Sequence, residues 1–183
     1  MFHWFIARQA ILKDNLTLLG CDLQFRAEEA SAGATDCSSA AYLTDSSTMV
    51  FRWESLTGNG LAFIPLGLQE LLSGAALILP RTKTVIEIPS SLPCTAEVVF
   101  ACKSLKTAGY RLSLGGWAAD EERRPLVDLA DYLRVDVHML QPFVQETGQR
   151  EGKTALIAGD VDTWEDHRKV TELGIRYCPG RLS

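Results

Sequence analysis

The residues of this chain that are most able to do chemistry are its cysteines, histidines and serines, and their spacing matches no catalytic or metal-binding pattern. The cysteines are Cys21, Cys37, Cys94, Cys102 and Cys178. Their number is odd and no Cys-x-x-Cys pair occurs, which argues against both a disulfide framework and a thiolate zinc site. We expect them to be reduced and mostly buried.

The histidines and hydroxyl groups give no stronger signal. His138 has no Cys or His nearby at ligand spacing, and the other two histidines have no evident triad partner. Ser113 and the other serines lack the Gly-x-Ser-x-Gly elbow. The turn at residues 56–61 contains no Gly-rich phosphate-binding motif. We interpret the run Glu121-Glu-Arg-Arg124 as the solvated start of a helix.

Composition and charge exclude several classes of protein. With 183 residues, 46% hydrophobic and 22% charged, the chain is predicted to form one folded domain over residues 1–183. The net charge of −5 disfavours a nucleic-acid or anionic membrane partner. No apolar run approaches the roughly 20 residues of a membrane span, and the N-terminus lacks a signal-peptide pattern. These features predict a cytoplasmic location.

Strand-like runs alternate with helix-like runs along almost the whole chain, which is typical of a mainly parallel sheet with crossover helices. The predicted strands are Trp4–Leu12, Leu16–Phe25, Leu61–Leu66, Thr84–Ile88, Arg111–Leu114, Tyr132–Val137, Thr154–Ala158 and Gly174–Cys178. The predicted helices are Ser38–Arg52, Leu68–Ala76, Ala96–Ala108, Glu121–Ala130, Pro142–Glu146 and Trp164–Leu173. Only Lys13-Asp14-Asn15 separates the first two strands, so we expect an antiparallel hairpin there.

Eight strands with a helix after most of them predict a small α/β barrel of the (βα)8, TIM-like type, with a doubly wound open sheet as the alternative. Such a barrel usually needs about 250 residues. The shorter chain therefore indicates short loops and room for one outer helix fewer than usual.

The strand segments, taken in order, resemble those of EAL domains, the cyclic-di-GMP phosphodiesterase family. The likeness is closest to the group in which an EAL domain precedes an HDOD domain. It implies a barrel with an antiparallel first strand and an active face at the C-terminal ends of the strands. The segments that carry the resemblance are FIARQAIL (5–12), LGCDLQFR (19–26), AFIPL (62–66), VIEI (85–88), AGYRLSLGGW (108–117), LRVDV (133–137) and ALIAGDVDT (155–163).

The resemblance also implies where the ligand-binding residues of the family fall. The signature Glu corresponds to Asp22, and the catalytic Lys corresponds to Arg134. Glu87 and Asp136 keep their acidic side chains. One further Glu of the family corresponds to Asp162, and the Arg that meets a phosphate of the dinucleotide corresponds to Arg26, for which an ion pair with a nearby acid is an equal alternative.

Other positions of the same set have lost their oxygen ligands. The metal-binding Asn corresponds to Pro65, and the Asp-Asp pair corresponds to Gly115-Gly116. A second Glu corresponds to Gly159, and the Gln near the last strand falls at Pro179. Two divalent cations need several converging oxygen ligands. The losses therefore predict a protein that is not an enzyme and holds no metal or cofactor, with its leftover carboxylates paired with Arg111, Arg134 or water.

The leading hypothesis is a catalytically inactive EAL-like domain that works as a protein-interaction or regulatory module in bacterial signalling, through a protein partner or a homodimer. The alternative is a receptor that binds cyclic-di-GMP without hydrolysing it, which the loss of ligands disfavours. A residual metal-dependent hydrolase and an unrelated α/β domain are further alternatives.

A group of large side chains in the second half of the chain suggests where association takes place. An equal alternative is that most of these side chains pack in the core. The group consists of Trp117, Leu126, Leu129, Tyr132, Met139 and Phe143.

Overall fold

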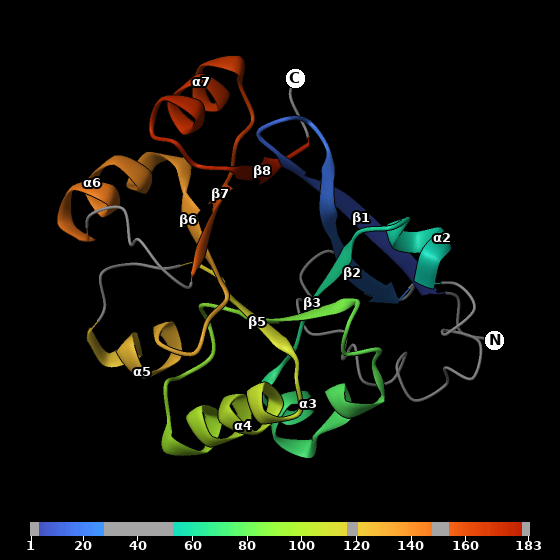
Figure 1. The fold of residues 1–183 in the computed structure, drawn as a ribbon. Helices are drawn as coiled ribbons and strands as arrows, with labels where there is room; N and C mark the ends of the chain where they lie inside the picture. Colours follow the sequence, from blue (N-terminus) through green and yellow to red (C-terminus); the bar gives the residue numbers. More distant parts are fainter. Residues whose placement is uncertain (1–3, 28–52, 117–120, 148–153, 181–183) are drawn as a thin grey trace.

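The chain folds into a closed barrel of eight strands surrounded by helices (Figure 1). The computed structural model describes residues 4–27, 53–116, 121–147 and 154–180. The strands follow one another around the barrel in sequence order, and β8 closes the ring against β1. The predicted α/β barrel is therefore confirmed, and the open doubly wound sheet is excluded.

The strands lie close to the positions that the sequence predicts. Their bounds are β1 Trp4–Lys13, β2 Leu18–Ala27, β3 Leu61–Pro65, β4 Thr84–Ile88, β5 Arg111–Leu114, β6 Tyr132–Asp136, β7 Ala155–Gly159 and β8 Tyr177–Pro179. β1 runs antiparallel to β2 and β8, whereas the other neighbouring pairs are parallel. The hairpin expected between the first two strands is thus confirmed.

Side chains fill the barrel on both faces of the sheet. Ile11, Phe63, Val85 and Ile157 come from four different strands and pack together in the interior. The alternate residues of the same strands, such as Ile64 and Ile86, belong to the larger cluster that includes the surrounding helices. Burial of both faces explains why the strands read as nearly continuous apolar runs.

The helices depart further from prediction than the strands do. Their bounds are α2 Trp53–Thr57, α3 Leu68–Ser73, the 3₁₀ helix η2 Ala75–Ile78, α4 Ala96–Thr107, the 3₁₀ helix η3 Glu121–Arg123, α5 Arg124–Val127, α6 Val137–Thr147 and α7 Trp164–Glu172. The predicted helix Leu68–Ala76 is split at Gly74, whose φ of 75° is left-handed. The predicted helix Pro142–Glu146 is too short, because Pro142 lies inside α6. The predicted helix Ser38–Arg52 lies outside the described residues.

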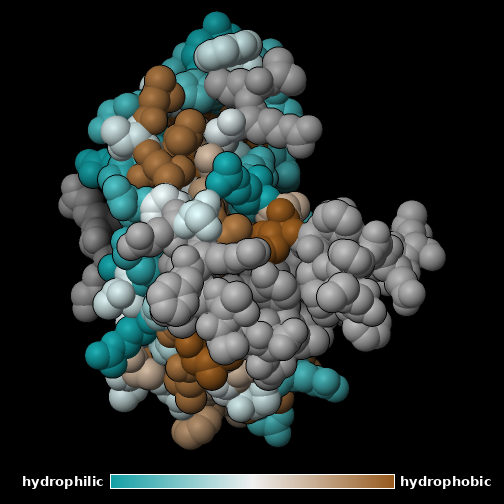
Figure 2. Space-filling view, turned by 90° about the vertical axis from the view of Figure 1, so that its right-hand side faces the viewer, coloured by the Kyte–Doolittle hydropathy of each residue, from teal (hydrophilic) through white to brown (hydrophobic). Residues whose placement is uncertain are grey.

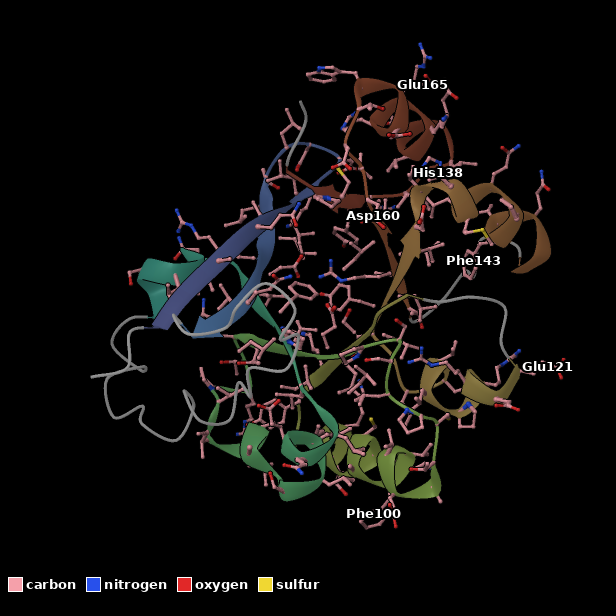
Figure 3. All side chains as sticks on the ribbon, turned by 180° about the vertical axis from the view of Figure 1, so that it is seen from behind. Phe100, Glu121, His138, Phe143, Asp160 and Glu165 are labelled. Atoms are coloured by element: carbon pink, nitrogen blue, oxygen red, sulfur yellow. The ribbon has the colours of Figure 1, made fainter. Side chains whose placement is uncertain are left out.

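Most of the large side chains suggested as an association surface are not exposed. Leu126 and Phe143 are 3% and 4% exposed, so core packing is the correct interpretation for both. Tyr132 packs against the interior cluster, while Met139 is 48% exposed. Trp117 lies outside the described residues. Figure 3 labels Phe143 on α6.

Two further properties of the described residues bear on function. Cys21, Cys102 and Cys178 are buried, as predicted, and Cys94 is partly buried; none of the four forms a disulfide within the described residues. Cys37 lies outside the described residues. No helix in the described part of the chain has the length and apolar character needed to cross a membrane.

Candidate functional site

The site lies where side chains of β2, β4 and β6 meet, next to the packed interior of the barrel. Asp22 on β2, Glu87 on β4 and Arg134 on β6 extend their side chains toward one another. Below them, Phe63 belongs to the interior cluster, and the guanidinium carbon of Arg134 lies 5.5 Å from the centroid of its ring. The fold therefore brings together three of the predicted site residues.

Arg134 joins the two carboxylates. Its Nε donates to Glu87 Oε2 at 2.8 Å, and its Nη1 donates to Asp22 Oδ2 at 3.0 Å. Its Nη2 donates to the second oxygen of Asp22, which makes that pair bidentate. The three side chains are 15–19% exposed. The expectation that leftover carboxylates pair with Arg134 is confirmed for Asp22 and Glu87.

Burial shapes the ionisation of this cluster. Removal from water raises the pKa of Glu87 above its usual value, although Arg134 opposes the shift. Desolvation also raises the pKa of Asp22. The pKa of Arg134 is raised because the attraction of the two carboxylates outweighs its own desolvation. The cluster therefore contains a permanent cation between two acids that are costly to ionise.

We expect these raised pKa values to appear in the stability of the protein. Between the ordinary and the raised pKa, the folded state holds more protons than the unfolded state, so the free energy of unfolding falls as the pH rises through that interval. Glu87→Gln should reduce this fall, as measured by urea unfolding between about pH 4 and pH 7. Asp128→Asn, at an exposed ion pair, is the matched control. Equal pH slopes for wild type and Glu87→Gln would contradict the assignment.

Asp136 and Asp162 lie outside this cluster. Asp136 follows Arg134 at the end of β6, where its Oδ1 accepts a hydrogen bond from the backbone N–H of His138 at 2.8 Å. Asp162 is exposed in the segment between β7 and α7. Arg26 lies on β2, where its backbone pairs with Phe5, and its side chain lies outside what the structure describes. Arg111, offered as a partner for the leftover acids, is exposed and donates to the carbonyl of Thr82.

Similarity to known proteins was found at both the sequence and the structural level. No family model matches the chain. The uncharacterized protein YuxH of Bacillus subtilis strain 168 is 25% identical over 188 residues, which covers 96% of this chain and 46% of YuxH. The chain thus spans about half the length of this relative.

The solved structures that resemble the chain include EAL proteins. A calcium and cyclic-di-GMP complex of BlrP1 from Klebsiella pneumoniae matches with a TM-score of 0.73 and 17% identity, covering 98% of this chain and 57% of BlrP1. YkuI of Bacillus subtilis, also with cyclic-di-GMP and calcium, gives 0.67 and 15%, covering 96% and 53%. A standalone EAL protein of Vibrio cholerae O395 gives 0.63 and 12%, covering 100% and 95%.

The chain has the EAL fold. Its antiparallel β1–β2 pair and its eight-stranded closed barrel agree with that assignment.

Three glycines of this EAL fold stand where the resemblance expects acids, and they differ in how much room they leave. A Cβ atom on Gly115 would lie 3.4 Å from Glu87 Oε1, and one on Gly159 would lie 3.6 Å from the Val135 carbonyl oxygen. A Cβ atom on Gly116 would lie 2.7 Å from the Cβ atom of Ser90, and Gly116 has a φ of 58°. A Cβ atom thus has room at Gly115 and Gly159 and conflicts with Ser90 at Gly116.

Sequence reasoning did not predict the burial of two polar residues, Ser113 and Arg123. Ser113 pairs in register with Glu87, is fully buried, and its Oγ lacks a hydrogen-bond partner among the described residues. Arg123 is 8% exposed and donates to the carbonyls of Pro89 and Ser90. The interpretation of Glu121–Arg124 as wholly solvated is therefore wrong for Arg123. Its burial depends on the segment that follows β4, which is distant in sequence.

Proposed function

We propose that this EAL-fold domain is catalytically inactive and acts by binding, as a protein-interaction or regulatory module in cytoplasmic signalling. The observation that carries the proposal is the ion-pair cluster, in which Arg134 bridges Asp22 and Glu87. A metal-dependent phosphodiesterase needs the oxygens of its carboxylates for cations and for the water that they activate.

In this cluster, few carboxylate oxygens remain available to bind a cation. Both oxygens of Asp22 and one oxygen of Glu87 accept hydrogen bonds from Arg134. A divalent ion would have to displace a guanidinium that cannot lose its charge and would then face that charge at close range. In the described residues, no group of three His, Cys, Asp or Glu side chains is placed to hold a metal ion.

The sequence supports the same proposal independently of the ion pairs. At the positions that the EAL resemblance assigns to the Asp-Asp pair and to the Asn, the chain has Gly115, Gly116 and Pro65. None of these side chains offers an oxygen ligand. The second cation of a metal pair would therefore lack its protein ligands.

A receptor that binds cyclic-di-GMP without hydrolysing it is the second candidate. The observation that favours it is that the similar BlrP1 and YkuI structures contain this dinucleotide. In this chain, Arg134 is already neutralised by two acids, which leaves less positive charge for a phosphate. We therefore rank the receptor below the interaction module.

Calorimetry separates the two candidates. We expect titration of cyclic-di-GMP into the purified protein to give no binding heat, either without divalent ions or with millimolar Mg²⁺ or Ca²⁺, because the acids and the cation of the site satisfy one another. A saturable heat that disappears in Glu87→Gln and Asp136→Asn would contradict the proposal and support the receptor. Glu165→Gln, on the exposed face of α7, is the control.

A further inference from the structure

Exposed apolar side chains of the described residues gather on one side of the barrel. Among the described residues, nine large hydrophobic ones are exposed, and five of these lie on α3, η2 and α4. The space-filling view has hydrophobic residues at its lower end, the end at which Figure 1 places α3 and α4 (Figure 2). The five residues are Leu68, Leu72, Leu77, Ile78 and Phe100.

A groove of about 450 Å³ runs between α4 and the pair formed by α3 and η2. Leu72 and Leu77 line one side, and Phe100 lines the other. Phe100 is 72% exposed, the highest value among the large hydrophobic residues of the described part of the chain. Figure 3 shows Phe100 on the outer side of α4, directed away from the barrel.

The outer face of α4 has a pattern that is nearly symmetric about Phe100. Three residues before it is Glu97 and three residues after it is Lys103, both exposed. Four residues before it is Ala96 and four residues after it is Ser104, both small and exposed. Residues at these spacings share one face of a helix. The face therefore reads small, acidic, aromatic, basic, small.

Such a face is complementary to itself when two copies of the helix pack antiparallel. A two-fold axis at Phe100 places each residue opposite the one equally distant on the other side of Phe100, so Glu97 of one copy faces Lys103 of the other, twice. Each charged residue lies about 4.5 Å along the helix from the axis. Small residues at the outer positions let the helices approach closely.

We propose that this chain forms a two-fold homodimer through α4, with Phe100 at its centre and the groove beside α3 receiving the partner's aromatic side chain. The inference deepens the proposed function and rests on it, because it gives the interaction module one partner, a second copy of the chain. Lys106, the other lysine of the helix, already pairs with Asp131 at 2.6 Å and is not needed across the interface. Lys103 and Glu97 form no ion pair within the described residues.

Sedimentation across a concentration series tests the dimer. We expect the wild-type protein to be dimeric at about 100 µM and Phe100→Glu to weaken the association at least about 100-fold, because it places a charge in the apolar centre. Trp164→Glu, at a residue 69% exposed on α7, should leave the association unchanged. Circular dichroism checks that both variants are folded.

Charge exchange tests the antiparallel register. Glu97→Lys and Lys103→Glu should each weaken the homodimer about tenfold, because each creates two repulsive pairs. An equimolar mixture of these two variants should associate as tightly as wild type, because the mixed dimer regains two attractive pairs. In a parallel helix pair, the wild type would already set Glu97 against Glu97 and Lys103 against Lys103, so neither single exchange would weaken its homodimer.

The outcomes are distinguishable from those of the proposed function. A wild-type protein that stays monomeric, or a dimer that Phe100→Glu leaves intact, overturns the homodimer. Single exchanges that leave the homodimer unweakened, or a mixture that does not recover, overturn the antiparallel register and with it the proposed interface. None of these results requires nucleotide hydrolysis, whereas turnover of cyclic-di-GMP would overturn the proposed function whatever the oligomeric state.

Discussion

Incubation of the purified protein with cyclic-di-GMP and millimolar Mg²⁺ or Mn²⁺ is expected to yield no linear dinucleotide above a protein-free blank. The reason is that two metal ions activate the water and stabilise the leaving oxygen in such a hydrolysis, and loss of the pair costs orders of magnitude in rate. Chromatography of the nucleotides after a long incubation measures the result. An EAL protein with demonstrated phosphodiesterase activity, assayed in parallel, establishes the sensitivity.

The control for this prediction is the retained acid of β4. Linear dinucleotide that forms with wild-type protein and disappears with Glu87→Ala would show turnover at this site and would contradict the prediction. Product that persists in Glu87→Ala would indicate a contaminating enzyme. The comparison of wild type with Glu87→Ala therefore distinguishes a real activity from an impurity.

The geometry at Gly115 and Gly116 also indicates how difficult it would be to give the protein phosphodiesterase activity by substitution. Gly115→Asp has room for its Cβ atom beside Glu87, whereas Gly116→Asp would meet Ser90 within 2.8 Å in a left-handed backbone conformation. An aspartate at Gly116 is therefore expected to strain the loop after β5 or shift Ser90. Restoring the Asp-Asp pair requires changes around the loop as well as at the two positions.

The order and direction of the strands could be predicted from the sequence because each strand has a recognisable local pattern of apolar residues. A run buried on both faces is apolar throughout, and the three residues at Lys13–Asn15 are too few for a crossover helix. Helix ends were less predictable. Gly74 ends α3 earlier than predicted, and Pro142 lies inside α6 instead of starting a helix. The ends of both helices depend on packing with distant parts of the chain, which the local sequence does not report.

The candidate site was predictable as a set of positions but not as an arrangement. The resemblance placed Asp22, Glu87 and Arg134 at strand ends, yet the bidentate contact of Arg134 with Asp22 depends on side-chain length and on the curvature of the barrel. Asp136 looked equivalent to Glu87 in the sequence, although its side chain accepts a hydrogen bond from the start of α6. Positions follow from strand order, whereas partners follow from three-dimensional distance.

Among the substitutions considered for the ion-pair cluster, replacement of Arg134 by Met is expected to cause the largest loss in the free energy of unfolding. The change leaves Asp22 and Glu87 partly buried, close together and without their cation. Removal of one partner from a buried ion pair typically costs about 3–5 kcal/mol, a large fraction of the about 5–15 kcal/mol that stabilises a domain. Urea unfolding at about pH 7 measures the free-energy difference from wild type.

Two comparisons show whether the loss comes from the unpaired acids. Addition of Asp22→Asn and Glu87→Gln to Arg134→Met should recover most of the lost stability, because no charge is then left buried without a partner. The deficit of Arg134→Met should also shrink as the pH is lowered, since protonation neutralises acids whose pKa values are already raised. Arg168→Met, which removes an exposed contact of 3.9 Å to Glu172, should change the stability by only about 0.5 kcal/mol. A loss in the free energy of unfolding for Arg134→Met as small as that of Arg168→Met would mean that the cluster does not stabilise the barrel. It would also remove the support for an Arg134 that occupies the two carboxylates in place of a metal ion.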